Sequence, residues 1–129
     1  MVGIDTNIFL RFIVQDHSEQ AHQATQLLSS NNTFFVTNIV MAEIVWTLQR
    51  VYCWERKEIA NLLKTLLEAG NLEFESEGSV IQATLAFETS GDWSDHLIQA
   101  LCKKHHCTSL ATFDRKFAQF YPDFVKLPS

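Results

Sequence analysis

The sequence predicts an α/β fold with a mainly parallel sheet. Short apolar runs alternate along the whole chain with longer segments of helical character, as expected for strands connected by helices. Only four Gly and two Pro occur among the 129 residues, and no repeat, linker or low-complexity stretch divides the chain. This length suits one core, so a single domain over residues 1–129 is expected.

Three residue patterns mark helix ends in the first half of the chain. Ser18 suits the N-cap of one helix, and Thr37 with Asn38 suits the start of another, because their side-chain oxygens accept hydrogen bonds from free amides. Gly70 suits the end of a third helix. The expected elements are a strand at residues 1–5, helices at 7–13 and 18–30, a strand at 33–36, and helices at 39–52 and 55–69.

The second half continues the alternation with shorter elements. The segment "LEFE" alternates apolar and charged residues, as a strand does. "TSLAT" and "DFVKL" are apolar enough for two further strands. The expected elements are strands at residues 72–75, 108–112 and 123–127, helices at 79–89 and 94–105, and a helical turn at 115–120.

Composition and charge exclude several classes of protein. Hydrophobic residues make up 47% and charged residues 19% of the chain, as in a soluble globular protein. No apolar run approaches the roughly 20 residues that span a bilayer, and a strand at Met1 leaves no room for a signal peptide. No membrane partner and a cytoplasmic location are therefore expected. The net charge of −5 opposes binding of nucleic acid by bulk attraction, but not by a metal site made of acids.

Two aspartates follow expected strands directly. Asp5 follows the apolar run "VGI", and Asp114 follows "TSLATF". In parallel α/β folds, the active crevice lies outside the carboxyl ends of the strands. Each aspartate has an alternative role as the N-cap of the following helix.

Glu43 is the one charged residue in the segment "IVMAEIVWTL". Its neighbours at helical spacing are mostly apolar, which indicates a buried carboxylate that needs a partner or a metal ion. The alternatives are a narrow solvent-facing side of this helix or a structural salt bridge. Trp46, in the same segment, is expected to pack in the core, and Trp54 is expected on a partner or dimer surface.

Asp92 and Asp95 stand three residues apart at an expected helix start, so they can face the same way. Helix capping is the alternative, for Asp92 above all. Gathered in one crevice, such carboxylates repel one another, and at least one of them should have a raised pKa. Oxygen-only ligands favour Mg²⁺ or Mn²⁺, and a pair of such ions can clamp the attacking and leaving oxygens of a phosphodiester.

Four motifs in order, "IDTNIFLRF", "MAEIVWTL", "DWSDHLIQALC" and "LATFDRKF", resemble those of the PIN-domain nucleases, and within them the VapC-type toxins. The resemblance covers the whole chain and implies a three-layer α/β/α fold. It also implies a metal-dependent ribonuclease whose metal and catalytic residues are Asp5, Glu43, Asp95 and Asp114. Supporting positions are Thr6, Asn7, Asp92 and Thr112, and possible RNA contacts are Arg11, Arg115 and Lys116.

The same resemblance implies partners. A VapC-type toxin of a type II toxin–antitoxin pair is expected to cleave RNA, to form a homodimer and to bind a small cognate antitoxin. A catalytically silent PIN scaffold that binds RNA or protein is the alternative. A phosphatase of the haloacid-dehalogenase type would need a second aspartate at the position of Asn7.

Overall fold

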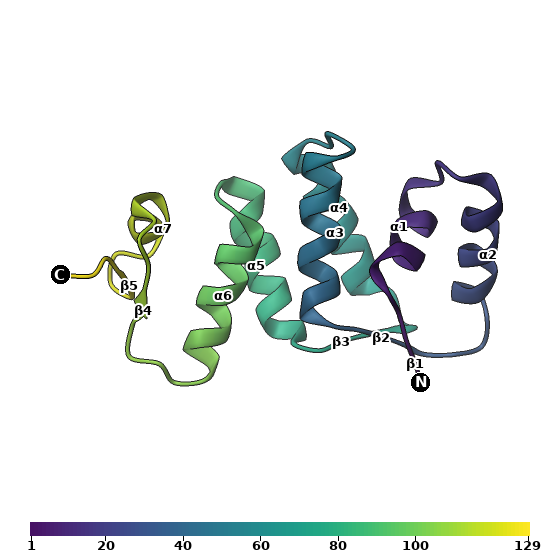
Figure 1. Ribbon diagram of the computed structural model, residues 1–129. Coiled ribbons are helices and arrows are strands. Elements are labelled where there is room, and N and C mark those ends of the chain that lie inside the picture. The colour runs from purple at the N-terminus through teal and green to yellow at the C-terminus, as the bar shows by residue number, and fades with distance from the viewer. The chain divides into compact units, whose positions relative to one another are not determined.

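The computed structural model describes residues 1–129 and divides into two compact units, Met1–Glu77 and Gly78–Ser129. Figure 1 shows the helices and strands of each unit. Seven helices alternate with short strands, and every strand pair is parallel, so the predicted α/β fold class with a mainly parallel sheet is confirmed. The single domain over residues 1–129 stays a prediction.

The first unit is built on a three-stranded sheet in the order β1-β2-β3. β2 lies in the centre, pairing with β1 through Val2 opposite Phe34 and with β3 through Phe34 opposite Leu72. Two helices connect each strand to the next, and both strand pairs are parallel. The elements are β1 (Val2–Gly3), α1 (Thr6–Val14), α2 (Ser18–Leu28), β2 (Phe34–Val36), α3 (Asn38–Arg50), α4 (Arg56–Glu68) and β3 (Leu72–Phe74).

Local hydrogen bonds account for the helix starts in this unit. The hydroxyl of Thr37 accepts from the amide of Val40 at 3.2 Å, as predicted. The predicted N-cap Ser18 is wrong by one residue, because the ring of His17 accepts from the amide of Gln20 instead. α4 ends before Gly70 as expected, but Gly70 does not take the left-handed conformation that favours glycine there.

The core of the first unit lies between the central strand and its helices. Phe34 and Val36 of β2 are fully buried, together with Phe9, Met41, Ile44, Leu48, Ile59 and Leu63. Burial of these apolar side chains fixes the register of the strands, since a shift by one residue would expose them. The carboxyl ends of the strands, where Asp5 follows β1, are thereby set at one edge of the sheet.

The second unit contains a two-stranded parallel sheet and three helices. Its elements are α5 (Glu77–Thr89), α6 (Trp93–Lys104), β4 (Leu110–Ala111), α7 (Arg115–Phe120) and β5 (Val125–Lys126). Trp93 is buried, and its Nε1 donates to the hydroxyl of Thr84 at 3.2 Å. A smaller core of Phe117, Phe124 and Val125 holds α7 against β5. None of the helices of the protein combines the length and apolar character that a membrane span requires.

Candidate active site

Asp5 occupies the position before the first turn of α1, yet its carboxylate does not cap that helix. The backbone is extended, with φ −86° and ψ 157°, and the carbonyl oxygen of Asp5 accepts from the amide of Phe9 at 3.2 Å. The side chain accepts no capping hydrogen bond and is exposed. Since an aspartate in this position ordinarily caps its helix, the carboxylate of Asp5 is left available to a ligand.

Glu43 is joined to the first turn of α1 by a hydrogen bond. The hydroxyl of Thr6 donates to Oε1 of Glu43 at 2.7 Å, and Thr6 is only 9% exposed. Because Thr6 follows Asp5 directly, this bond holds the carboxylate of Glu43 close to the end of β1. Asn7, the next residue, is exposed in the same turn.

The interpretation of Glu43 as buried is wrong, and the alternative of a solvent-facing side of this helix is confirmed, because α3 has an exposed face that is itself apolar. Ile39 is 72% exposed and Trp46 is 57% exposed, and both lie at helical spacing from Glu43. The helix buries the opposite face, made by Val40, Met41, Ile44, Val45 and Leu48. Glu43 therefore lies on the solvent-facing side, and Trp46, predicted in the core, lies there too. Trp54 is half-buried.

The start of α3 adds acceptor oxygens to the same edge of the sheet. The amide of Asn38 donates to Oε1 of Glu75 at 2.9 Å, and its Nδ2 donates to the hydroxyl of Ser76 at 3.1 Å. Oδ1 of Asn38 is buried without a hydrogen-bond partner. Buried acceptors are ordinarily satisfied, so Oδ1 of Asn38 is one acceptor left over at this edge.

In the second unit, Asp92 caps α6 and Asp95 lies in its first turn. Oδ1 of Asp92 accepts from the amide of Asp95 at 2.9 Å, so the capping interpretation of Asp92 is confirmed. Burial raises the pKa of Asp95, and the negative charges of Asp92 and Asp114 raise it further, while His96 acts in the opposite sense. A raised pKa was predicted from repulsion between carboxylates; at Asp95 the pKa is raised, but burial contributes more than repulsion.

Asp114 caps α7 at the end of β4. Its Oδ1 accepts from the amide of Phe117 at 3.1 Å, and its own amide donates to the hydroxyl of Thr112 at 3.0 Å. Thr112 therefore fixes the turn that carries Asp114. Arg115 and Lys116 follow in the first turn of α7, and both are exposed.

Sequence reasoning missed His96, which is 3% exposed in the first turn of α6. Its Nε2 lies 2.8 Å from the carbonyl oxygen of Ser90, and its Nδ1 lies 2.5 Å from the hydroxyl of Tyr121. A carbonyl oxygen only accepts, so Nε2 carries a proton, and in the neutral form of the ring Nδ1 accepts from the hydroxyl of Tyr121. These three residues, the His96 clasp, tie the start of α6 to the end of α7.

Gly91 makes room for this clasp. Its φ of 91° lies in the region that favours glycine, and a Cβ there would stand 2.5 Å from Nε2 of His96. Because α6 carries Asp95 and α7 carries Asp114, the clasp sets the position of one carboxylate relative to the other. No sequence pattern indicates a pairing between His96 and Tyr121, which stand 25 residues apart.

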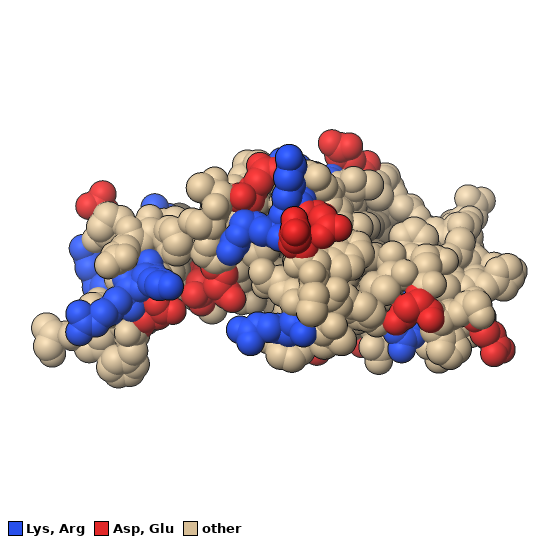
Figure 2. Space-filling model, turned by 90° about the horizontal axis from the view of Figure 1, so that it is seen from above, with Lys and Arg blue, Asp and Glu red and all other residues tan.

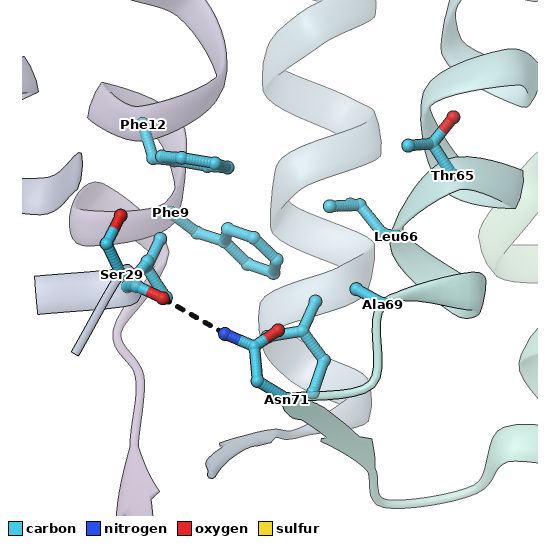
Figure 3. Close-up of a pocket in the computed structure, with 9 residues that line it drawn as sticks. Phe9, Phe12, Ser29, Thr65, Leu66, Ala69 and Asn71 are labelled. Atoms are coloured by element: carbon cyan, nitrogen blue, oxygen red, sulfur yellow. Dashed lines mark hydrogen bonds between the residues drawn. The ribbon is translucent and has the colours of Figure 1, made fainter. Parts of the chain in front are cut away.

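An apolar pocket of about 200 Å³ lies elsewhere in the first unit. Figure 3 shows Phe9 and Phe12 of α1 on one side and Leu66 and Ala69, at the end of α4, on the other. Nδ2 of Asn71 donates to the carbonyl oxygen of Leu28 at 3.0 Å along its rim. None of the predicted catalytic residues lines this pocket, so its chemistry suits an apolar side chain rather than a phosphodiester.

The predicted carboxylates are gathered as two groups, one in each unit. Asp5 and Glu43 belong to the first unit, and Asp92, Asp95 and Asp114 belong to the second. No group of three or more His, Cys, Asp or Glu side chains is assembled closely enough to hold a metal ion. The candidate metal ligands are nonetheless carboxylate oxygens, which suit a hard divalent cation. The negative charges of Asp92 and Asp114 also act on Asp95, and a cation would offset them.

A model of the PIN domain family matches residues 2–121. The chain belongs to the PIN domain family. PIN domains are generally nucleases that hydrolyse RNA with the help of divalent metal ions. Neither a curated protein nor a solved structure matches the chain.

Proposed function

We propose that this PIN protein is a metal-dependent endoribonuclease and the VapC-type toxin of a type II toxin–antitoxin pair. The observation that carries the proposal is the carboxylate of Asp5, which stands at a strand end without capping its helix, with Glu43 held beside it through Thr6. A carboxylate left uncommitted at the carboxyl end of a parallel strand is placed where α/β folds bind their ligands.

The proposed metal and catalytic residues are Asp5, Glu43, Asp95 and Asp114, and the proposed ion is Mg²⁺ or Mn²⁺. When bound, such an ion lowers the pKa of a water molecule and offsets negative charge on a phosphodiester. Thr6 holds Glu43 by its hydroxyl, and Thr112 holds the turn of Asp114. Asn7 and Asp92 support the acids from the first turn of α1 and the cap of α6.

The proposed RNA contacts are Arg11, Arg115 and Lys116. On the face shown in Figure 2, basic side chains stand in separate groups with acidic ones among them, in agreement with the net charge of −5. We therefore propose that a few individual Arg and Lys side chains, rather than a broad basic surface, contact the RNA.

Two features support the proposed homodimer and antitoxin. Ile39 and Trp46 expose apolar area on one face of α3, and aromatic side chains are enriched where proteins associate. The apolar pocket of Figure 3 suits an aliphatic or aromatic side chain of the antitoxin. Light scattering tests the dimer: the full chain should have twice the mass of the monomer, and Trp46→Glu should lower it. A monomer at high concentration would contradict the dimer.

The direct test of the activity is cleavage of RNA in the presence of Mg²⁺ or Mn²⁺, compared with the same reaction in EDTA. Wild type should cut RNA only with the ion, and Asp5→Asn should not cut it. RNA that is bound but remains intact under every condition would favour the silent scaffold. Cleavage in EDTA would contradict metal dependence.

A further inference from the structure

A polar hollow of about 150 Å³ opens in the first unit, next to the first turn of α1. Asn7 and Ile8, which line it, follow Asp5 by two and three residues. The other lining residues are Arg11 of α1 and Gln20 and Gln23 of α2. The hollow therefore lies beside the strand end that carries Asp5, and most of its lining can form hydrogen bonds.

The guanidinium group of Arg11 is held in place within this hollow. Its Nε donates to Oε1 of Gln20 at 2.7 Å, and its Nη1 lies 3.6 Å from Oδ1 of Asp16. Asp16 in turn accepts from the hydroxyl of Tyr52 at 2.9 Å. A guanidinium plane held from two sides retains N–H groups for a further partner, and less conformational freedom is lost when that partner binds.

The orientation of Gln20 makes the hollow rich in donors. Because Oε1 of Gln20 accepts from Arg11, the amide NH₂ of Gln20 is the group left for a ligand. Arg11 itself can only donate. Guanine presents two acceptors, O6 and N7, on one edge, whereas adenine presents an NH₂ donor where guanine has O6. Ile8, which is 38% exposed, adds an apolar surface for the face of a ring.

We propose that this hollow binds a guanine base of the RNA, in the nucleotide next to the scissile phosphate. The inference rests on the proposed nuclease function for its substrate. It extends that function to a base preference, which Arg11 and Gln20 set through the acceptor edge of guanine.

The first experiment measures binding without cleavage. Full-length ¹⁵N-labelled protein in EDTA is titrated with GMP and, separately, with AMP, while the side-chain amide signals of Gln20, Gln23 and Asn7 are followed by NMR. The phosphate is common to both nucleotides, so a difference reports the base. GMP should bind about tenfold more tightly than AMP. Equal binding, or shifts confined to other residues, would overturn the proposal.

Matched variants assign the preference to the hollow. Gln20→Ala removes the donor and releases Arg11, so it should abolish most of the preference for GMP. Gln26→Ala changes an exposed glutamine of the same helix that does not line the hollow, and it should keep the preference. A loss of preference in both variants, or in neither, would overturn the assignment.

The second experiment measures cleavage of RNAs that differ only in the nucleotides flanking the cut. Gln20→Ala should reduce the ratio of rates for guanine over adenine about tenfold. Cleavage with no preference for guanine in wild type would overturn the hollow while leaving the nuclease intact. No cleavage, combined with selective binding of GMP at Gln20, would overturn the nuclease and leave the hollow as a guanine nucleotide site.

Discussion

Three aspartates directly precede helices: Asp5 in the first unit, and Asp92 and Asp114 in the second. Their carboxylates differ in whether they cap the helix that follows. Asp92 and Asp114 accept hydrogen bonds from the first turns of α6 and α7. Asp5 accepts none from α1. The same residue type at the same kind of position is therefore structural in one unit and uncommitted in the other.

The surroundings of the carboxylates also differ between the two units. In the first unit, Glu43 receives a hydrogen bond from the hydroxyl of Thr6. In the second unit, Asp95 lies among other carboxylates and is partly buried, and both conditions raise its pKa. The two units therefore differ: Asp95 of the second unit has a raised pKa, whereas Asp5 of the first unit has a carboxylate that caps no helix.

The largest expected effect on activity is that of Asp5→Asn. If Asp5 binds the metal ion and caps nothing, cleavage should fall by more than about a hundredfold, since even residues behind a metal ligand are worth ten- to hundredfold. The free energy of unfolding should stay within about 0.5 kcal/mol of wild type. Glu19→Gln, an exposed acid of α2, serves as the control and should preserve both quantities. Retained cleavage by Asp5→Asn would remove Asp5 from the site.

The largest expected effect on stability is that of His96→Ala. This change leaves Ser90 and Tyr121 without their partner and opens a cavity, so it should lower the free energy of unfolding by about 3 kcal/mol. Tyr121→Phe removes one hydroxyl and should cost about 1 kcal/mol. Urea unfolding measures both, with the exposed His22→Ala as a control. If His96→Ala is no less stable than Tyr121→Phe, the clasp is not the contact that holds α6 to α7.

Thr6→Val keeps the branched shape of the side chain and removes the hydroxyl that donates to Glu43. Cleavage should fall about ten- to hundredfold, because Glu43 loses the group that orients it. Stability should fall by about 1 kcal/mol. Thr6→Ser retains the hydroxyl and should restore most of the activity. Equal activity of the two variants would show that the hydrogen bond does not orient Glu43.

A smaller effect separates capping from metal binding at Asp92. Asp92→Ala removes the cap of α6 and should lower stability by about 1 kcal/mol, whereas Asp92→Asn keeps a good N-cap. Thermal melts of both variants give these differences, and their cleavage rates show whether the charge of Asp92 matters. If Asp92→Asn cleaves as fast as wild type, Asp92 serves only as a cap.

The pH dependence of stability should identify Asp95. Its pKa in the folded state is raised above the ordinary value of 3.8, so the folded state holds this proton more tightly than the unfolded state. The tighter binding of this proton stabilises the folded state. This stabilisation is fully present below pH 3.8 and is lost as the pH rises through the pKa of Asp95 in the folded state. Asp95→Asn should therefore be more stable than wild type near neutral pH, but not below pH 3.8. Urea unfolding of both proteins at several pH values measures this difference.

The strands, the helices and the capping residue Thr37 were predictable because they depend on local pattern. β2 appears where the run "TFFV" predicted it, and Asp92 caps the helix that the sequence placed after it. The N-cap His17 was missed because an imidazole can accept through Nδ1 and take the role that serine usually fills.

The sequence alone could not decide between a buried and an exposed Glu43, and it could not predict the role of His96. Apolar neighbours at helical spacing normally indicate burial, but the face of α3 that carries Ile39 and Trp46 is exposed. His96 depends on Tyr121 from a distant helix and on the backbone of Ser90 and Gly91, and no local pattern encodes such a contact.

A calorimetric titration of the full chain with Mn²⁺ tests most directly whether Asp5 belongs to a cation site. If Asp5 is a ligand, wild type binds the ion, and Asp5→Asn weakens binding at least about tenfold. Glu19→Gln should bind as wild type does. Unchanged binding in Asp5→Asn, or no binding by wild type, would contradict the proposed role of Asp5.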